Sequence, residues 1–119
     1  MAHFSNYYRW MEAAEHAFLK NRDIALREIV DGIEIAWPRV ACDCQYLSPL
    51  RFGEVIEVSL EIAELKNRAI RYEFQIRATG SSNLVAKGSL TVVCAELKQN
   101  SIQAIEIPSD IRKKLEGSR

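Results

Sequence analysis

Hydrophobic residues near the start of the chain recur every three or four positions. This spacing, from Tyr7 to Lys20, puts them on one face of an amphipathic helix. The members of that face are Tyr7, Trp10, Met11, Ala14, Ala17 and Phe18. Ser5 or Asn6 can cap the helix, because either side chain accepts hydrogen bonds from the free N–H groups of the first turn. The pattern predicts one long helix, followed over residues 21–31 by a loop with one helical turn.

From Gly32 onward the hydrophobic residues alternate with polar ones, which indicates β-strands. Residues 33–47 predict one long strand. Its hydrophobic positions change phase by one residue at Pro38, and such a change indicates a bulge or a bend.

Three more strands follow, separated by short polar turns. They are predicted at residues 56–62, 70–77 and 84–95. In the last of them Gly88 occupies the hydrophobic face, where another part of the chain can approach the backbone closely. Pro108 opens a short C-terminal helix that extends to Leu115.

A helix followed by a run of strands predicts the α+β class, with the helix lying across an antiparallel sheet. The length of 119 residues suits a single domain, residues 1–119. One helix covers only one face of such a sheet. We therefore expect a second copy of the chain to cover an edge or the other face, as a homodimer or homotetramer.

Composition excludes several classes of protein. Sixteen basic and sixteen acidic residues cancel, which argues against nucleic acid as a partner. No hydrophobic stretch approaches the roughly 20 residues that span a bilayer, and the first residues lack the pattern of a signal peptide. We therefore expect a cytoplasmic protein without membrane contact. Three cysteines, with no C-x-x-C spacing, are expected to be buried free thiols. Phosphate-binding, dinucleotide-binding and serine-hydrolase motifs are missing from the sequence, and no cofactor is expected.

Several segments resemble the hotdog thioesterases related to 4-hydroxybenzoyl-CoA thioesterase. FSNYYRWMEAA at residues 4–14 is similar to the start of that family's central helix. YLSPLRFGE at residues 46–54 is similar to the turn after its second strand. LVAKG at residues 84–88 and IP at residues 107–108 are similar to its last strand and closing segment. The likeness extends from about His3 to the C-terminus.

This resemblance implies a hotdog fold, in which a curved antiparallel sheet wraps around one long central helix. It also implies dimers that pair through the long second strand, here residues 33–47. Members of the family hydrolyse acyl-CoA thioesters at the subunit interface, near the N-terminus of the central helix.

One feature of the family is missing from these 119 residues. The family usually carries an aspartate in a D-x-x-G stretch just before the helix, preceded by a first strand. That aspartate would lie four residues upstream of Met1. Either the start of the chain is assigned too late, or the protein lacks this carboxylate. The second case favours a catalytically silent hotdog protein that binds acyl-CoA or acyl carrier protein, or a structural dimer. The D-x(4)-H motif of hotdog dehydratases does not occur in the sequence, which argues against a dehydratase.

Thioester hydrolysis needs donors for the carbonyl oxygen and a base for water. The free amides at the helix start, those of Asn6, Tyr7 and Tyr8, can supply the donors, although an ordinary capped helix would look the same. His3 and Glu12 are the candidate bases.

Each of these assignments has an alternative. For His3 the alternative is a residue near the terminus with no catalytic role. Glu12 has a structural alternative in a surface pair with His16, and no metal site is expected there because a third ligand is lacking. Arg51, Lys66 and Arg68 are candidate contacts for the CoA phosphates, against the alternative of solvated turns.

Overall fold

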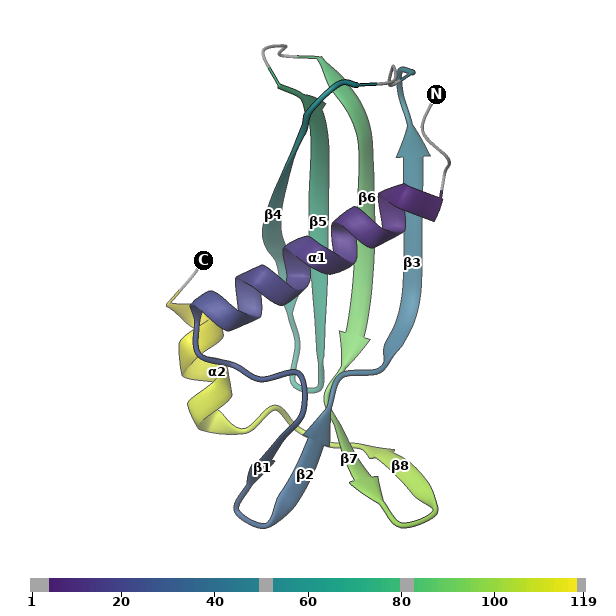
Figure 1. The fold of residues 1–119 in the computed structure, drawn as a ribbon. Coiled ribbons are helices and arrows are strands. Elements are labelled where there is room, and N and C mark those ends of the chain that lie inside the picture. Colours follow the sequence, from purple (N-terminus) through teal and green to yellow (C-terminus); the bar gives the residue numbers. More distant parts are fainter. Residues whose placement is uncertain (1–4, 50–52, 80–82, 118–119) are drawn as a thin grey trace.

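The computed structural model describes residues 5–49, 53–79 and 83–117. These residues form two helices and eight strands, and every strand pairing is antiparallel, which confirms the predicted α+β class (Figure 1). The elements in chain order are α1 Ser5–Asn21, β1 Glu28–Val30, β2 Ile33–Ala36, β3 Arg39–Tyr46, β4 Ile56–Leu65, β5 Ala69–Ala78, β6 Leu84–Val93, β7 Ala95–Lys98, β8 Ser101–Ala104 and α2 Ser109–Glu116. Both predicted helices are present. Neither described helix is long and apolar enough to cross a membrane.

The strands form two sheets rather than one. The larger sheet has the order β3-β6-β5-β4 and the smaller one β1-β2-β7-β8. The prediction of a single strand over residues 33–47 was wrong, because β2 and β3 belong to different sheets. The division falls at Pro38, which has no N–H to donate to a ladder. Its carbonyl accepts a hydrogen bond from the amide of Val93, at the end of β6.

The bulge predicted at this place is confirmed. Arg39 pairs with Val92, but Ala41 pairs with Thr91, so Val40 is an extra residue in β3. A bulge of this kind bends the strand and redirects the side chains around it.

The small sheet contains strands that were not predicted. Segment 21–31, expected to hold a helical turn, instead ends in β1, and the hairpin of β7 and β8 was missed. These strands are only three or four residues long, which is too short for an alternating pattern to be distinctive. The turn between β1 and β2 has positive φ angles at Asp31 (52°) and Gly32 (79°), as the sequence Asp-Gly favours in hairpins.

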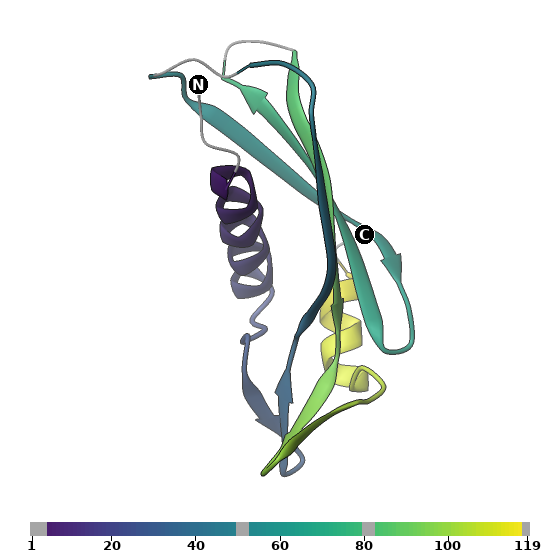
Figure 2. The same cartoon turned by 90° about the vertical axis from the view of Figure 1, so that its right-hand side faces the viewer.

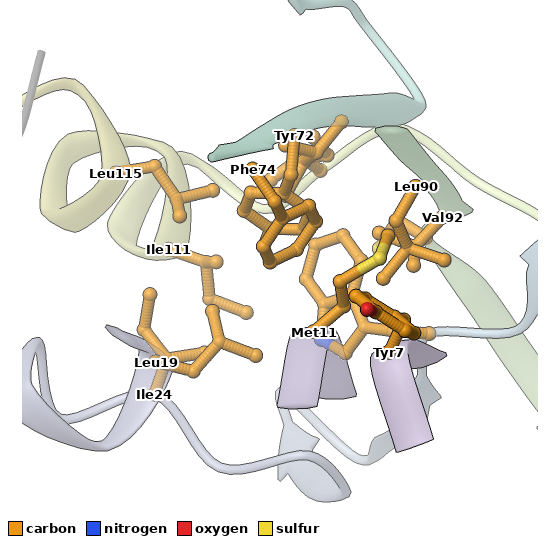
Figure 3. Packing of buried hydrophobic residues seen from close by; sticks show 14 of the residues in the cluster. Tyr7, Met11, Leu19, Ile24, Tyr72, Phe74, Leu90, Val92, Ile111 and Leu115 are labelled. Atoms are coloured by element: carbon orange, nitrogen blue, oxygen red, sulfur yellow. The ribbon is translucent and has the colours of Figure 1, made fainter. Parts of the chain in front are cut away.

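Helix α1 crosses one face of the larger sheet, and α2 lies near the C-terminal end of α1 (Figures 1 and 2). The core lies between the two helices and the larger sheet. Figure 3 shows Met11 of α1 among side chains of the sheet, and Leu19 and Ile24 facing Ile111 of α2. Together these contacts fix which face of α1 lies over the sheet.

Gly88 on β6 lies close to both α1 and β3. A Cβ at this position would lie 2.7 Å from the carbonyl oxygen of Asp43 and 2.9 Å from Sδ of Met11. The close approach expected from the sequence is therefore confirmed, and its partners are a neighbouring strand and the helix.

Candidate functional site

The first turn of α1 is held against the end of β3 by aromatic rings. Tyr7 is only 4% exposed, and its ring packs edge-on against Tyr46 of β3, with 4.8 Å between centroids. The ring of Trp10 makes a similar contact with Tyr7 at 5.1 Å. Such pairs have a preferred geometry, so they orient the helix start as well as bury surface.

Tyr8 lies on the side of α1 that faces β3. Partial burial raises the pKa of its hydroxyl, and the proximity of Cys42, Cys44 and Asp43 raises it further. Tyr8 as a whole residue is 36% exposed. Tyr8 therefore presents a protonated hydroxyl beside the accessible surface of β3.

One turn later, Arg39 of β3 joins two carboxylates of α1. Its Nη2 lies 2.6 Å from Oε1 of Glu15 and 3.3 Å from Oε2 of Glu12. The side chain of Glu15 is 1% exposed and that of Glu12 is 53% exposed. Burial raises the pKa of Glu15, and Arg39 opposes this shift because its positive charge favours the carboxylate.

Beneath this group lies Tyr72 of β5, fully buried in the core. Burial raises the pKa of its hydroxyl, and the nearby charge of Glu15 raises it further. Within the described part of the chain, this hydroxyl has no hydrogen-bond partner. The underside of the site therefore holds an unpaired hydroxyl, and Arg39 is the group that forms an ion pair with the buried Glu15.

Tyr8 and Glu12 lie four residues apart and share one face of α1. Glu12 follows Tyr8 by one helical turn, and its carboxylate contacts Arg39 of β3. The first amides of the helix have no intrahelical acceptor and can bind an oxyanion. A bound carbonyl at the helix start would therefore have backbone donors and an accessible carboxylate on the same side.

Strand β3 borders this site and is open to solvent on both faces. It pairs only with β6, so its other edge has no partner strand among the described residues. Val40, Tyr46 and Leu47 are 49–59% exposed. Cys42 is also exposed, and only Cys94 is fully buried, so the expectation that all three thiols are buried was wrong. The cause is the edge position of β3, because α1 covers only part of its inner face.

Comparison with known proteins assigns the chain to a family. A family model described as the Thioesterase-like superfamily matches residues 1–115. This chain belongs to the thioesterase-like superfamily.

Relatives of this thioesterase-like chain include named enzymes. It is 26% identical over 87 residues to a 1,4-dihydroxy-2-naphthoyl-CoA hydrolase from Prochlorococcus marinus, a match that covers 67% of the chain and 56% of that hydrolase. Among solved structures, a hypothetical protein from Thermus thermophilus is 30% identical, with a TM-score of 0.82 over 99% of the chain and 86% of the other protein. A gentisyl-coenzyme A thioesterase is 26% identical, with a TM-score of 0.77 over 97% of the chain and 86% of the enzyme.

The structure brings together some of the residues suggested by the sequence. Asn6, Tyr7, Tyr8 and Glu12 all lie on the first two turns of α1, next to β3. Glu12 contacts Arg39, and no ion pair between Glu12 and His16 is found among the described residues. His3 and Arg51 lie outside the described residues.

Lys66 and Arg68 lie elsewhere in the thioesterase-like chain. They flank the turn between β4 and β5, whose backbone accepts a hydrogen bond from Arg112 of α2. Tyr46 of β3 and Ile76 of β5 both pair with Ala86 of β6, so they lie at the same level of the sheet. The turn between β4 and β5 leads into Ala69, at the other end of β5. Ile76 and Ala69 are seven positions apart along β5, which corresponds to about 23 Å. Within one chain, these two cations are therefore remote from the start of α1.

Sequence reasoning missed Arg39 and Glu15. Glu15 follows Met11 by four residues and therefore falls on the buried stripe of α1, where a charged residue is unusual. That irregularity was a usable signal. Arg39 carried no such signal in the sequence. Its contact with α1 depends on the bulge in β3, and the sequence does not show which side chain that bulge directs to the helix.

Proposed function

We propose that this chain hydrolyses acyl-CoA thioesters to the free acid and CoA at the N-terminus of α1. Membership of the thioesterase-like superfamily supports the reaction class. The observation that carries the location is Glu12, an accessible carboxylate on the same helix face as Tyr8, one turn from free backbone amides.

In this reaction the amides of Asn6, Tyr7 and Tyr8 hold the thioester carbonyl oxygen. Glu12 takes a proton from a water molecule, and the oxygen of that water attacks the carbonyl carbon. Negative charge then develops on the carbonyl oxygen, where the amides and the helix dipole stabilise it. Collapse of the tetrahedral intermediate breaks the C–S bond, and the proton held by Glu12 passes to the departing CoA sulfur. His3 is the second candidate base in this scheme.

The same proposal includes the assembly. Residues 1–119 form one hotdog domain whose sheet wraps around α1, and two copies pair through β3 into a homodimer or a homotetramer. The open edge and the exposed Val40 and Tyr46 of β3 support this, since an unpaired edge strand is a template for another strand. The substrate then lies at the subunit interface, beside β3. Arg51, Lys66 and Arg68 serve the CoA phosphates only if the extended pantetheine arm reaches them.

The test is thiol release from a panel of short, long and aromatic acyl-CoAs. We expect hydrolysis by the wild type and a fall in kcat on the order of 10²- to 10⁴-fold in Glu12→Gln, which keeps the shape but loses the base. Glu61→Gln, an exposed glutamate on β4, is the matched control and should retain full activity. Equal activity of Glu12→Gln and Glu61→Gln would exclude Glu12 as the base, and His3→Ala would then test the other candidate.

If the wild type hydrolyses none of these substrates, the proposal that the chain is an acyl-CoA thioesterase is refuted. Calorimetric titration with a thioether analogue of an acyl-CoA would then distinguish the binding protein from the structural dimer.

A further inference from the structure

Arg39 occupies a bridging position that the proposed reaction does not yet use. One guanidinium nitrogen, Nη2, contacts both the buried Glu15 and the accessible Glu12. The shorter contact, 2.6 Å, is to the buried carboxylate, and the longer one, 3.3 Å, is to the accessible carboxylate. Glu15 therefore fixes the guanidinium, and the guanidinium in turn restrains Glu12.

The bulge in β3 is what directs Arg39 to the helix. Cys44 packs against the core on the α1 side of the strand, and Cys42 shares that side by alternation. In a regular strand, a residue three positions before Cys42 would point away from α1. The inserted Val40 reverses this, and Arg39 reaches the carboxylates of α1.

Stability alone is a poor reason for this arrangement. Taking a carboxylate out of water is costly, and a buried ion pair is often no more stabilising than an apolar side chain of similar volume. Glu15 lies on a stripe of α1 that otherwise packs into the core, between Met11 and Leu19. A leucine there would satisfy the packing, whereas a glutamate can also hold Arg39 in one place.

We propose that Arg39 is a positioning residue for the Glu12 carboxylate, with Glu15 as its buried anchor. This inference rests on the proposed function, in which Glu12 activates the water molecule. Without Arg39, the Glu12 side chain is free to turn into solvent. With it, the carboxylate stays on the β3 side of α1, the side on which Tyr8 lies one turn earlier. Placement of a catalytic group to within about 1 Å affects rates by up to about a hundredfold.

The test compares kcat and KM for the best acyl-CoA substrate in a set of variants. Arg39→Met keeps the length of the side chain and removes its charge. We expect kcat to fall on the order of 10- to 100-fold, with KM changed by less than about threefold, because the group acts on the base and not on substrate binding. Arg39→Lys should recover part of the lost kcat, since lysine supplies a cation without the planar fork. Glu15→Gln, which is nearly isosteric, should lower kcat in the same direction.

Arg71→Met is the matched control. Arg71 also joins two carboxylates, Glu64 and Glu73, each at 2.9 Å, and it is 35% exposed against 39% for Arg39. It lies on the opposite face of the sheet from the buried Tyr72, so its loss should leave kcat unchanged. Thermal unfolding of every variant separates a folded protein with low kcat from a poorly folded one.

The double variant Glu12→Gln/Arg39→Met shows whether Arg39 acts through Glu12. If it does, the double variant should be within about twofold of Glu12→Gln alone, because the group that Arg39 positions is already gone. Additive losses, or equal kcat in Arg39→Met and Arg71→Met, would overturn the positioning role while leaving the thioesterase intact. An inactive wild type would overturn the proposed function and this role together.

Discussion

Gly88→Ala tests the close packing of β6 against β3 and α1. The new Cβ would lie 2.7 Å from the carbonyl oxygen of Asp43 and 2.9 Å from both Cε and Sδ of Met11, closer than such contacts tolerate. Met11 is flexible, but the carbonyl belongs to a strand that is paired with β6 along its length. Either β3 or α1 must therefore move.

The expected cost combines two opposing effects. Overpacking a core site costs about 1–3 kcal/mol. Replacing glycine in a strand recovers about 0.5–1 kcal/mol, because the unfolded chain loses less freedom. Because the contact at 2.7 Å is to backbone, we expect overpacking to exceed the gain, with a net loss of up to about 2.5 kcal/mol in the free energy of unfolding, which for a chain of this length lowers the Tm by up to about 10 °C.

Thermal and urea unfolding followed by circular dichroism measure this loss. Gly117→Ala is the control, since a Cβ there meets atoms only at 3.6 and 3.9 Å, and the Tm should change little. The double variant Gly88→Ala/Met11→Ala identifies the partner. Its cost should be less than the sum of the single variants, because removal of the Met11 side chain relieves part of the clash. A Tm for Gly88→Ala at or above that of the wild type would refute the reasoning.

Three further predictions concern the buried carboxylate, the thiols and the edge strand. Burial raises the pKa of Glu15 above its ordinary 4.5, so the folded chain holds that proton more tightly. The free energy of unfolding of the wild type, relative to that of Glu15→Gln, should therefore fall as the pH rises from 4.5 toward the raised pKa. Urea unfolding of both proteins at several pH values measures this difference, and a constant difference would contradict the prediction. A thiol reagent should modify native Cys42 and spare Cys94, which is buried with a pKa raised to about 11, until the chain unfolds; equal rates would argue against the burial. Light scattering should give a mass above 13.6 kDa, reduced toward that value by Val40→Lys, and a monomeric wild type would exclude pairing through β3.

The local elements of this protein follow from local patterns. The spacing of Tyr7, Met11 and Phe18 predicts α1, and strict alternation predicts β4 and β5, because each pattern repeats often enough to be distinctive. Gly88 stood out because a glycine on a buried strand face implies a close neighbour. The neighbour itself could not be named, since Met11 is 77 residues away in the chain.

By itself, the sequence determined the α+β class, the long helix, the phase change at Pro38 and the likeness to thioesterases. The tertiary structure decided where each strand found its partner. In the structure, β2 and β3 belong to different sheets, and β3 is an edge strand among the described residues. The sequence could not show this, because strand pairing depends on segments that are distant in the chain. The tertiary structure also brought Arg39 to Glu12 and Glu15, since one extra residue in a strand redirects a side chain only when the helix that receives it is in place.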